Sequence, residues 1–346
     1  MNRFGNRVLW CLSIVLLTVG CATQAPEKKE DLVWPLPPEQ PRVRFLRTYC
    51  CLEDLGAKSG TDAFLAALFG AGGNLRMSKP YGITTDKDGK VYVTDTGFRT
   101  VWVFDEKGKK VSFLGAGTLR TPIGVAVDAK GKIFVSDSAA QRVYAFDEKG
   151  KAVMILGQAQ KDELGNPSGL AIDLATNRLY VANAKLHHIK VYDTDSGKFL
   201  FDIGGRGTDK GRLNFPTNIF IRHGKLYVSD TGNFRIQLFD LDGKFIKAFG
   251  QVGDRYGEFA RPKGIGADSE GHIYVTDAAF DNFQIFDEQG RLLLFVGSKG
   301  TDDGYFWIPA GLHVDEKDRI YVADQYNNRI QIFQYLSEPK ATTKSP

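Results

Sequence analysis

The chain has 346 residues and a nearly balanced charge, with 45 lysine and arginine residues against 41 aspartate and glutamate residues and a formal net charge of +4. This composition lacks the strong basic excess that is typical of nucleic-acid-binding proteins. The chain has four cysteines, and none has the C-x-x-C or C-x-x-C-H spacing, which excludes covalently attached haem and a zinc site built from cysteines.

The first 20 residues have the organisation of a signal peptide. Two arginines precede an apolar run, Val8–Val19, which is too short to span a bilayer comfortably. The segment Leu17–Cys21 resembles the lipobox of bacterial lipoproteins, so we expect lipidation of Cys21 and export to the cell envelope. Because Ala22 follows the cysteine, the anchor is expected in the outer membrane if the host is Gram-negative. The alternative is a simple cleaved signal in which Cys21 has no role.

Residues 21–41 are expected to form a tether. The segment is polar and then rich in proline, and proline at that density favours an extended polyproline II chain. Such a chain would hold the folded part of the protein away from the lipid surface. Basic and apolar side chains alternate in the next segment, Arg42–Tyr49, and this period of two residues predicts a β-strand.

Residues 50–79 join this strand to the first repeat. A short helix is predicted at Ala63–Phe69, because residues able to cap a helix precede it and glycines follow it. The segment begins with two adjacent cysteines, Cys50 and Cys51. Adjacent cysteines cannot cross-link distant parts of the chain, so we expect two free thiols, with a strained disulfide between them as the alternative.

Six copies of one pattern follow between Pro80 and Phe333. Each copy has a proline, a residue and usually a glycine, then an apolar strand, a turn, a strand resembling Tyr-Val-x-Asp, a polar loop and another apolar strand. The opening prolines recur every 42 to 49 residues, at Pro80, Pro122, Pro167, Pro216, Pro262 and Pro309. This period, with its short β-branched and aromatic strands, is typical of a β-propeller blade. A single blade cannot bury both faces of its sheet, so the copies are predicted to stack in one ring.

The first copy is predicted to contain four strands, at Tyr81–Thr85, Lys90–Thr94, Thr100–Phe104 and Val111–Leu114. The sixth copy lacks a fourth strand, and residues 337–346 are expected to be a disordered tail. Arg42–Tyr49 is predicted to supply the missing strand and close the ring, which removes an exposed sheet edge. The predicted fold is therefore an all-β, six-bladed β-propeller of four-stranded antiparallel blades, spanning residues 42–336.

An Asp-x-x-Asn-x-Arg-Ile element occurs twice in the repeats. It begins at Asp230 and again at Asp324, and the other copies keep part of it. In this element and in the register of the six copies, residues 80–334 resemble the NHL-repeat family of β-propellers. The resemblance implies the six-bladed fold but leaves the activity open, because the family includes enzymes, sensors and interaction platforms.

The histidines are the main test for an enzyme, because some six-bladed relatives, such as the peptide-amidating lyases, hold a metal with several histidines near the axis. In this chain His313 falls in an inner strand, where it is a candidate to face the channel. The other histidines fall in turns and loops, on two opposite faces. A three-histidine zinc site is therefore not expected. We expect no cofactor, and a calcium ion held in the channel by carbonyls and an aspartate stays open as an alternative.

The loops between second and third strands should share one face with the connections between blades. We predict the ligand site on this face, at six pairs of loop residues: Phe98, Arg99, Gln141, Arg142, His187, His188, Phe234, Arg235, Asp281, Asn282, Asn328 and Arg329. Phe98 and Phe234 would provide an aromatic contact surface in otherwise polar loops. The connections before the last three blades share a glycine and an aromatic residue, which indicates a structural plug between blades rather than a catalytic motif.

Three of these arginines have two interpretations. Arg142, Arg235 and Arg329 each follow an aspartate by five residues. The simpler interpretation is a charge-assisted hydrogen bond to that aspartate within the same loop. The alternative is a ring of guanidinium groups that binds an anionic or glycan ligand.

Together these features predict a monomeric, lipid-anchored binding or scaffolding module outside the cytoplasm. Its expected ligand is a protein, peptide or glycan of the cell envelope, and its lipid makes the membrane a second partner. A nucleic-acid partner is not expected for an exported chain. The alternatives are a lyase or hydrolase on the same ring, and a sensor of envelope state.

Overall fold

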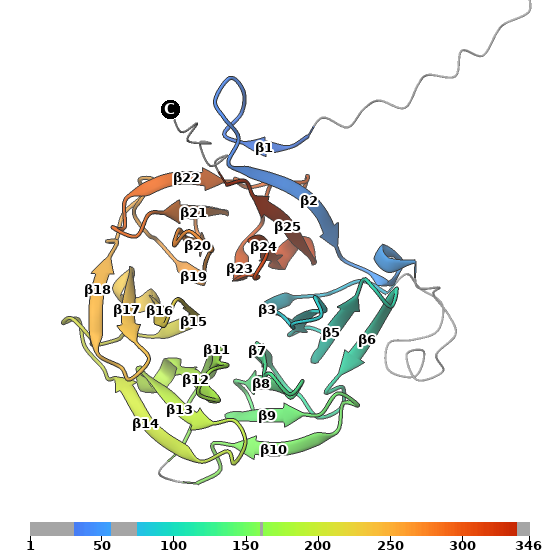
Figure 1. The fold of residues 1–346 in the computed structure, drawn as a ribbon, viewed down its shortest axis with the longest axis vertical. Coiled ribbons are helices and arrows are strands. Elements are labelled where there is room, and N and C mark those ends of the chain that lie inside the picture. The colour runs from blue at the N-terminus through green and yellow to red at the C-terminus, as the bar shows by residue number, and fades with distance from the viewer. Residues whose placement is uncertain (1–30, 57–74, 160–161, 338–346) are drawn as a thin grey trace, which may run out of the picture. The chain divides into compact units, whose positions relative to one another are not determined.

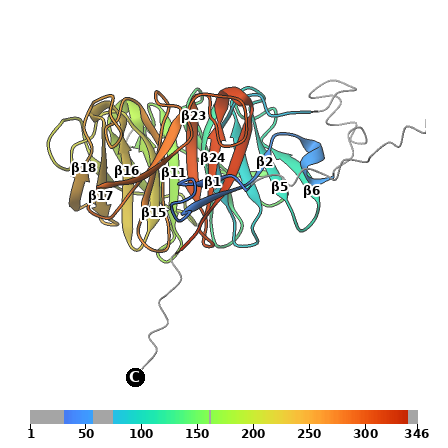
Figure 2. The same ribbon diagram turned by 90° about the horizontal axis from the view of Figure 1, so that it is seen from above.

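The computed structural model describes residues 31–56, 75–159 and 162–337. The unit that begins at Leu32 is a ring of six antiparallel β-sheets around a central axis (Figure 1). Each sheet has the first strand of its repeat at the axis. The last strand of the repeat forms the rim in five sheets, and N-terminal strands form it in the sixth. Figure 2 shows the ring edge-on. The predicted all-β, six-bladed propeller is therefore confirmed.

The strands follow the repeats. Blades 1 to 3 contain β3 Pro80–Thr85, β4 Val91–Asp95, β5 Thr100–Asp105, β6 Lys110–Leu114, β7 Pro122–Val127, β8 Ile133–Asp137, β9 Arg142–Phe146, β10 Ala152–Leu156, β11 Pro167–Asp173, β12 Arg178–Asn183, β13 His188–Asp193 and β14 Phe199–Gly204. Blades 4 and 5 contain β15 Pro216–Arg222, β16 Lys225–Asp230, β17 Arg235–Asp240, β18 Phe245–Phe249, β19 Pro262–Ala267, β20 Ile273–Asp277, β21 Asn282–Phe286 and β22 Leu292–Val296. Blade 6 contains β23 Pro309–Val314, β24 Arg319–Asp324, β25 Arg329–Tyr335, β2 Val43–Tyr49 and β1 Val33–Trp34.

The helices of the described residues are short 3-10 turns. They are η1 Leu52–Leu55, η3 Ala184–Leu186, η4 Thr231–Asn233 and η5 Gln325–Asn327. Within the described ranges, no helix has the length and apolar character that crossing a membrane requires.

The N-terminal strand β2 closes blade 6. It pairs antiparallel with β25, from Val43 opposite Tyr335 to Tyr49 opposite Ile330. The ring of Phe45 packs edge-on against that of Phe333, with centroids 5.6 Å apart. The predicted closure by Arg42–Tyr49 is confirmed, and it covers the outer edge of β25 that the sixth repeat would otherwise expose.

The proline-rich segment differs from the expected tether at its C-terminal end. β1 pairs with β2, with Val33 opposite Arg44, and the Trp34 ring packs edge-on against Phe333 at 5.7 Å between centroids. Burial of a large aromatic ring against blade 6 accounts for the difference, because this gain offsets the cost of ordering a few residues. The predicted signal peptide, Cys21, the helix at Ala63–Phe69 and most of the predicted tail lie outside the described residues.

Glycine in the Pro-x-Gly motif lets the inner strands converge at the axis. A Cβ atom on Gly82 would lie 2.2 Å from the carbonyl oxygen of Ile123 in the next blade. A Cβ atom on Gly311 would lie equally close, 2.2 Å, to the carbonyl oxygen of Tyr81. Any larger residue at these positions would push neighbouring blades apart, so the glycines fix the width of the ring at the axis.

A buried aspartate or asparagine at the end of each second strand holds the connection that enters the blade. Asp95 accepts the backbone N–H groups of Ser78 and Lys79, at 2.7 and 3.0 Å. The equivalent residues are Asp137, Asn183, Asp230, Asp277 and Asp324. These hydrogen bonds satisfy the buried oxygens and fix one face of the ring. We call this face, which carries the connections and the loops between second and third strands, the loop face, and the opposite face, which carries the hairpin turns, the turn face.

Candidate functional site

All six pairs of predicted ligand residues lie in or beside the loops between second and third strands, on the loop face. One residue of each pair has a left-handed backbone, with φ between 52° and 58°: Arg99, Gln141, His187, Phe234, Asp281 and Asn328. Residues other than glycine adopt this conformation at a cost in free energy, so each loop is a tight turn that its neighbours must stabilise.

Three of these left-handed residues hold the next connection in place. Gln141 Nε2 donates to a backbone carbonyl of the following connection at 3.1 Å, and Asp281 accepts a backbone N–H at 2.6 Å. His187 Nδ1 accepts the N–H of Phe215 at 3.1 Å. Burial and the nearby Arg206 lower the pKa of His187, which fits a neutral ring whose Nδ1 accepts a hydrogen bond. Part of the sequence variation among the loops is therefore structural, because each of these three side chains forms a hydrogen bond with a different connection.

Arg235 and Arg329 make the predicted charge-assisted hydrogen bonds. Arg235 Nε donates to Asp230 at 2.8 Å, and Arg329 Nε donates to Asp324 at 2.7 Å. The guanidinium groups also donate to backbone carbonyls of the preceding connection. Arg235 binds three such carbonyls, and Arg329 binds two. Burial raises the pKa of Asp324, and hydrogen bonds that include one from Arg329 oppose this rise. Both arginines thus have a structural role in the ring.

Arg142 holds the same position in blade 2 but is bound differently. The carboxylate of Asp137 is occupied by three backbone N–H groups, those of Arg120, Thr121 and Ala140. Arg142 Nη1 donates instead to the carbonyl of Gln141, its neighbour in the chain, at 2.7 Å. The structural interpretation is therefore correct for Arg235 and Arg329 and wrong for Arg142.

The exposed aromatic residues of the loop face are not the two that we predicted. Phe98 is half-buried with its ring centroid 6.4 Å from that of Trp102, and Phe234 packs partly buried against a hydrophobic core. The exposed aromatic side chains of this face include instead Phe215, Trp307 and Tyr326, which are 51%, 41% and 47% exposed, and Tyr256 and Tyr305 in the connections, which are 61% and 46% exposed. Sequence reasoning missed Phe215 and Trp307 because they lie beside the buried residues of the structural plugs.

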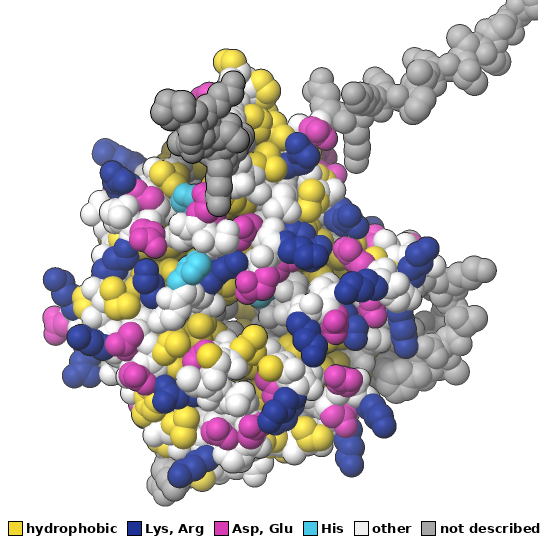
Figure 3. Space-filling model, viewed as in Figure 1, with side chains coloured by type: hydrophobic (Ala, Val, Ile, Leu, Met, Phe, Trp, Pro, Cys, Tyr) yellow, Lys and Arg dark blue, Asp and Glu magenta, His cyan; other side chains and the backbone are white. Residues whose placement is uncertain are grey.

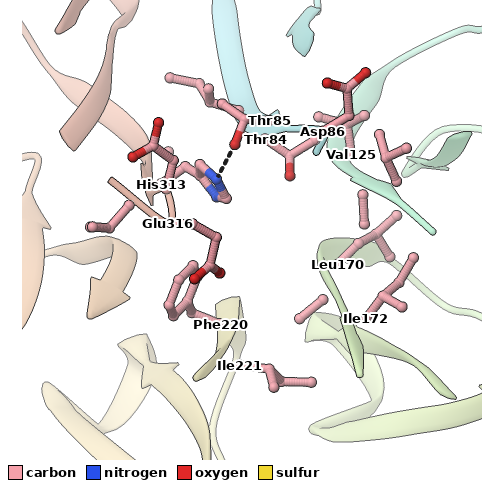
Figure 4. Close-up of a pocket in the computed structure, with 18 of the residues that line it drawn as sticks. Thr84, Thr85, Asp86, Val125, Leu170, Ile172, Phe220, Ile221, His313 and Glu316 are labelled. Atoms are coloured by element: carbon pink, nitrogen blue, oxygen red, sulfur yellow. Dashed lines mark hydrogen bonds between the residues drawn. The ribbon is translucent and has the colours of Figure 1, made fainter. Parts of the chain in front are cut away.

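A pocket of about 340 Å³ lies at the axis among the inner strands and the hairpin turns of the turn face (Figure 4). Its apolar wall includes Val125, Leu170 and Phe220, and His313 lines it as predicted. The His313 Nε2 atom lies 3.0 Å from the hydroxyl of Thr85. Burial lowers the pKa of His313 to about 4, so the ring is neutral at pH 7.

Two carboxylates at the mouth of this axial pocket, those of Asp86 and Asp315, are bound within their own turns. Asp315 accepts two backbone N–H groups and the Nε of Arg319, the last at 2.7 Å. Asp86 likewise accepts two backbone N–H groups and the hydroxyl of Tyr92. Basic and acidic side chains are interspersed over the face seen in Figure 3. The axial pocket thus combines an apolar wall and one neutral imidazole with charged groups at its mouth.

Metal-ligating side chains do not gather around His313 in the described residues. His223 Nε2 contacts the carbonyl oxygen of Asp268 at 3.1 Å, and His272 Nδ1 contacts the carboxylate of the same residue at 2.8 Å. In the described part of the chain, the group with metal-ligand spacing is Cys50, Cys51 and Asp54, near η1. The sulfur atoms of Cys50 and Cys51 lie 2.7 Å apart, and burial raises the pKa of both thiols.

Comparison with known proteins supports the fold at the level of the repeat. Residues 306–333 match the family model of the NHL repeat. The protein is a six-bladed β-propeller that contains an NHL repeat. The protein named brain tumor of Drosophila melanogaster is 28% identical to this propeller over 108 residues, which make up 30% of this chain but 10% of that protein.

Several solved propellers share the architecture. A virginiamycin B lyase from Staphylococcus aureus is 15% identical with a TM-score of 0.54, covering 75% of this chain and 96% of that one. An auxiliary nutrient binding protein from Bacteroides thetaiotaomicron is 16% identical with a TM-score of 0.59, covering 75% and 70%. A gluconolactonase from Xanthomonas campestris is 18% identical with a TM-score of 0.59, covering 87% and 99%. At these identities the likeness concerns the fold alone.

Proposed function

We propose that this propeller is a binding module of the cell envelope, anchored through lipid on Cys21. Its ligand, a protein, peptide or glycan, contacts the loop face. The observation that carries the proposal is the exposure of Phe215, Trp307 and Tyr326 on that face. Large aromatic side chains gain free energy when a partner covers them, and they are enriched at the centres of binding surfaces.

The arrangement of these side chains supports a contact surface. The rings of Trp307 and Tyr326 lie together with centroids 5.6 Å apart, and the ring of Phe215 packs edge-on against His187 at 4.7 Å. The backbone beneath them is held by buried hydrogen bonds, such as that from the Trp307 N–H to Asp324 at 2.8 Å. A fixed backbone with half-exposed rings loses little conformational entropy on binding.

A lyase or hydrolase acting in the axial pocket is the second candidate. The feature that favours it is the pocket itself, with His313 on its wall. An imidazole with a pKa of about 4 is a weak general base at neutral pH, because catalytic bases work best with a pKa near the operating pH. For this reason we favour a binding function over catalysis.

Ligand capture by the wild-type chain and by a variant without the rings of Phe215, Trp307 and Tyr326 tests the binding proposal.

A further inference from the structure

The connection before blade 2 is shorter than the connections before blades 4, 5 and 6. It spans residues 115–121, whereas the other three span 205–215, 250–261 and 297–308. Each long connection inserts a fully buried plug residue, which is Leu213, Phe259 or Phe306. The predicted structural plug is therefore confirmed for these three blades. The short connection buries Leu119 but lacks the additional residues of the long form.

In the blades with long connections, carbonyl groups of the plug satisfy the polar side chains of the third strand. In blade 4, Gln237 Nε2 donates to the carbonyl of Arg212 at 2.6 Å, and Arg235 donates to the same carbonyl at 2.9 Å. Blade 2 has Tyr144 at the position of this glutamine and Arg142 at the position of this arginine. Arg142 thus has the donors of its counterparts without the acceptors that a long connection provides.

A groove of about 580 Å³ lies between the loops of blades 1 and 2, beside the short connection. Arg99, Arg120 and Arg142 line it, together with Phe98 and Tyr144. No aspartate or glutamate of the described residues is part of its lining, and the described part of the chain contains no ion pair to these three arginines. The nearby Asp137 carboxylate is fully buried and accepts the backbone N–H groups of Arg120, Thr121 and Ala140, so it is not part of the lining. The three guanidinium groups around the groove therefore give it a positive potential that attracts anions.

We infer that this groove binds an oxyanion, a phosphate or carboxylate group of a ligand. The oxygens of the ligand take the place that plug carbonyls occupy around Arg235 and Arg329. The planar guanidinium group presents paired N–H donors that match phosphate and carboxylate oxygens, and an anion adds charge attraction that a carbonyl lacks. The inference rests on the proposed binding function and deepens it, because it assigns the ligand an acidic group.

Isothermal titration of the purified chain with inorganic pyrophosphate and, separately, with citrate tests this inference. The variant R99Q/R142Q removes two charges from the groove and keeps polar side chains of similar length. R255Q is the matched control, because Arg255 lies in the connection before blade 5, on the same face but outside the groove. Thermal unfolding of all three proteins checks that the ring stays intact.

We expect the double variant to bind the better of the two anions at least about tenfold more weakly than the wild type, and R255Q to stay within about twofold of it. Preference for pyrophosphate indicates a phosphate ligand, and preference for citrate indicates a carboxylate ligand. Absence of binding to either anion, or equal binding by the double variant and the wild type, overturns the inference. Capture of an envelope ligand through the aromatic residues does not depend on anion binding in the groove. A failure of the oxyanion inference can therefore be distinguished from a failure of the proposed function.

Discussion

The surroundings of His313 disfavour a positive charge at the axis of the propeller. Its imidazole packs edge-on against the ring of Phe220, with centroids 5.8 Å apart, and shares a hydrogen bond with Thr85. Protonation would place a cation in this apolar wall, and the Arg222 guanidinium would repel it. Both effects lower the pKa of His313, although Asp315 opposes them. The folded ring therefore favours the neutral imidazole.

The variant H313Q should remove a pH dependence of stability. Between about pH 4 and pH 6.5 the unfolded chain binds a proton at His313 that the folded chain does not, so the free energy of unfolding falls as the pH falls through this window. We expect the wild type to lose about 2 kcal/mol more than H313Q between about pH 7 and pH 4.5. Denaturant titrations at both pH values measure the difference, and equal losses would contradict the assignment.

Arg142 and Arg235 show why the site was only partly predictable from the sequence. Each follows an aspartate by five residues, so the local pattern predicts the same hydrogen bond for both. The structure gives this bond to Arg235 and not to Arg142, because Asp137 accepts three backbone N–H groups instead. The sequence also does not show which aromatic side chains are exposed, because Phe306 is fully buried while Trp307, the next residue, is 41% exposed.

At the scale of elements, the repeat register predicted the strands closely. The strands of the first copy were predicted within one residue at each end, because turn residues and period-two alternation mark both limits. The closing strand was predictable because the sixth repeat lacks its own outer strand. β1 was not, because its proline-rich sequence favours an extended chain, and long-range interactions order it: the pairing with β2 and the contact of Trp34 with Phe333.

Deletion of residues 32–49 should destabilise the propeller severely. The deletion removes β1 and β2, exposes the edge of β25 and uncovers Phe333, so we expect aggregation or a loss of most of the folding free energy. Deletion of residues 22–30, which lie outside the described residues, is the matched control and should leave the melting temperature within about 2 °C of the wild type. Equal melting of the two deletion variants would contradict the role of β2.

At the scale of the whole molecule, a binding role at the cell envelope requires that the ring is attached there. The lipobox-like segment that ends at Cys21 predicts a lipid anchor, so C21S should abolish incorporation of a fatty-acid analogue into the protein. The variant should also be released from membranes or keep its signal peptide. Wild-type chain in the same cells is the control. Unchanged labelling of C21S would show that the chain is not a lipoprotein.

Ligand capture from intact envelopes shows whether the ligand of this propeller binds the loop face. The variant F215A/W307A/Y326A removes three exposed rings of the loop face. L200A/I246A/L293A removes apolar side chains of comparable exposure, 39%, 44% and 52%, from the outer strands β14, β18 and β22. After crosslinking, we expect the first variant to lose at least about 90% of the wild-type capture with an unchanged melting temperature, and the second to capture as the wild type does. Full capture by the first variant and loss by the second would contradict a ligand site on the loop face.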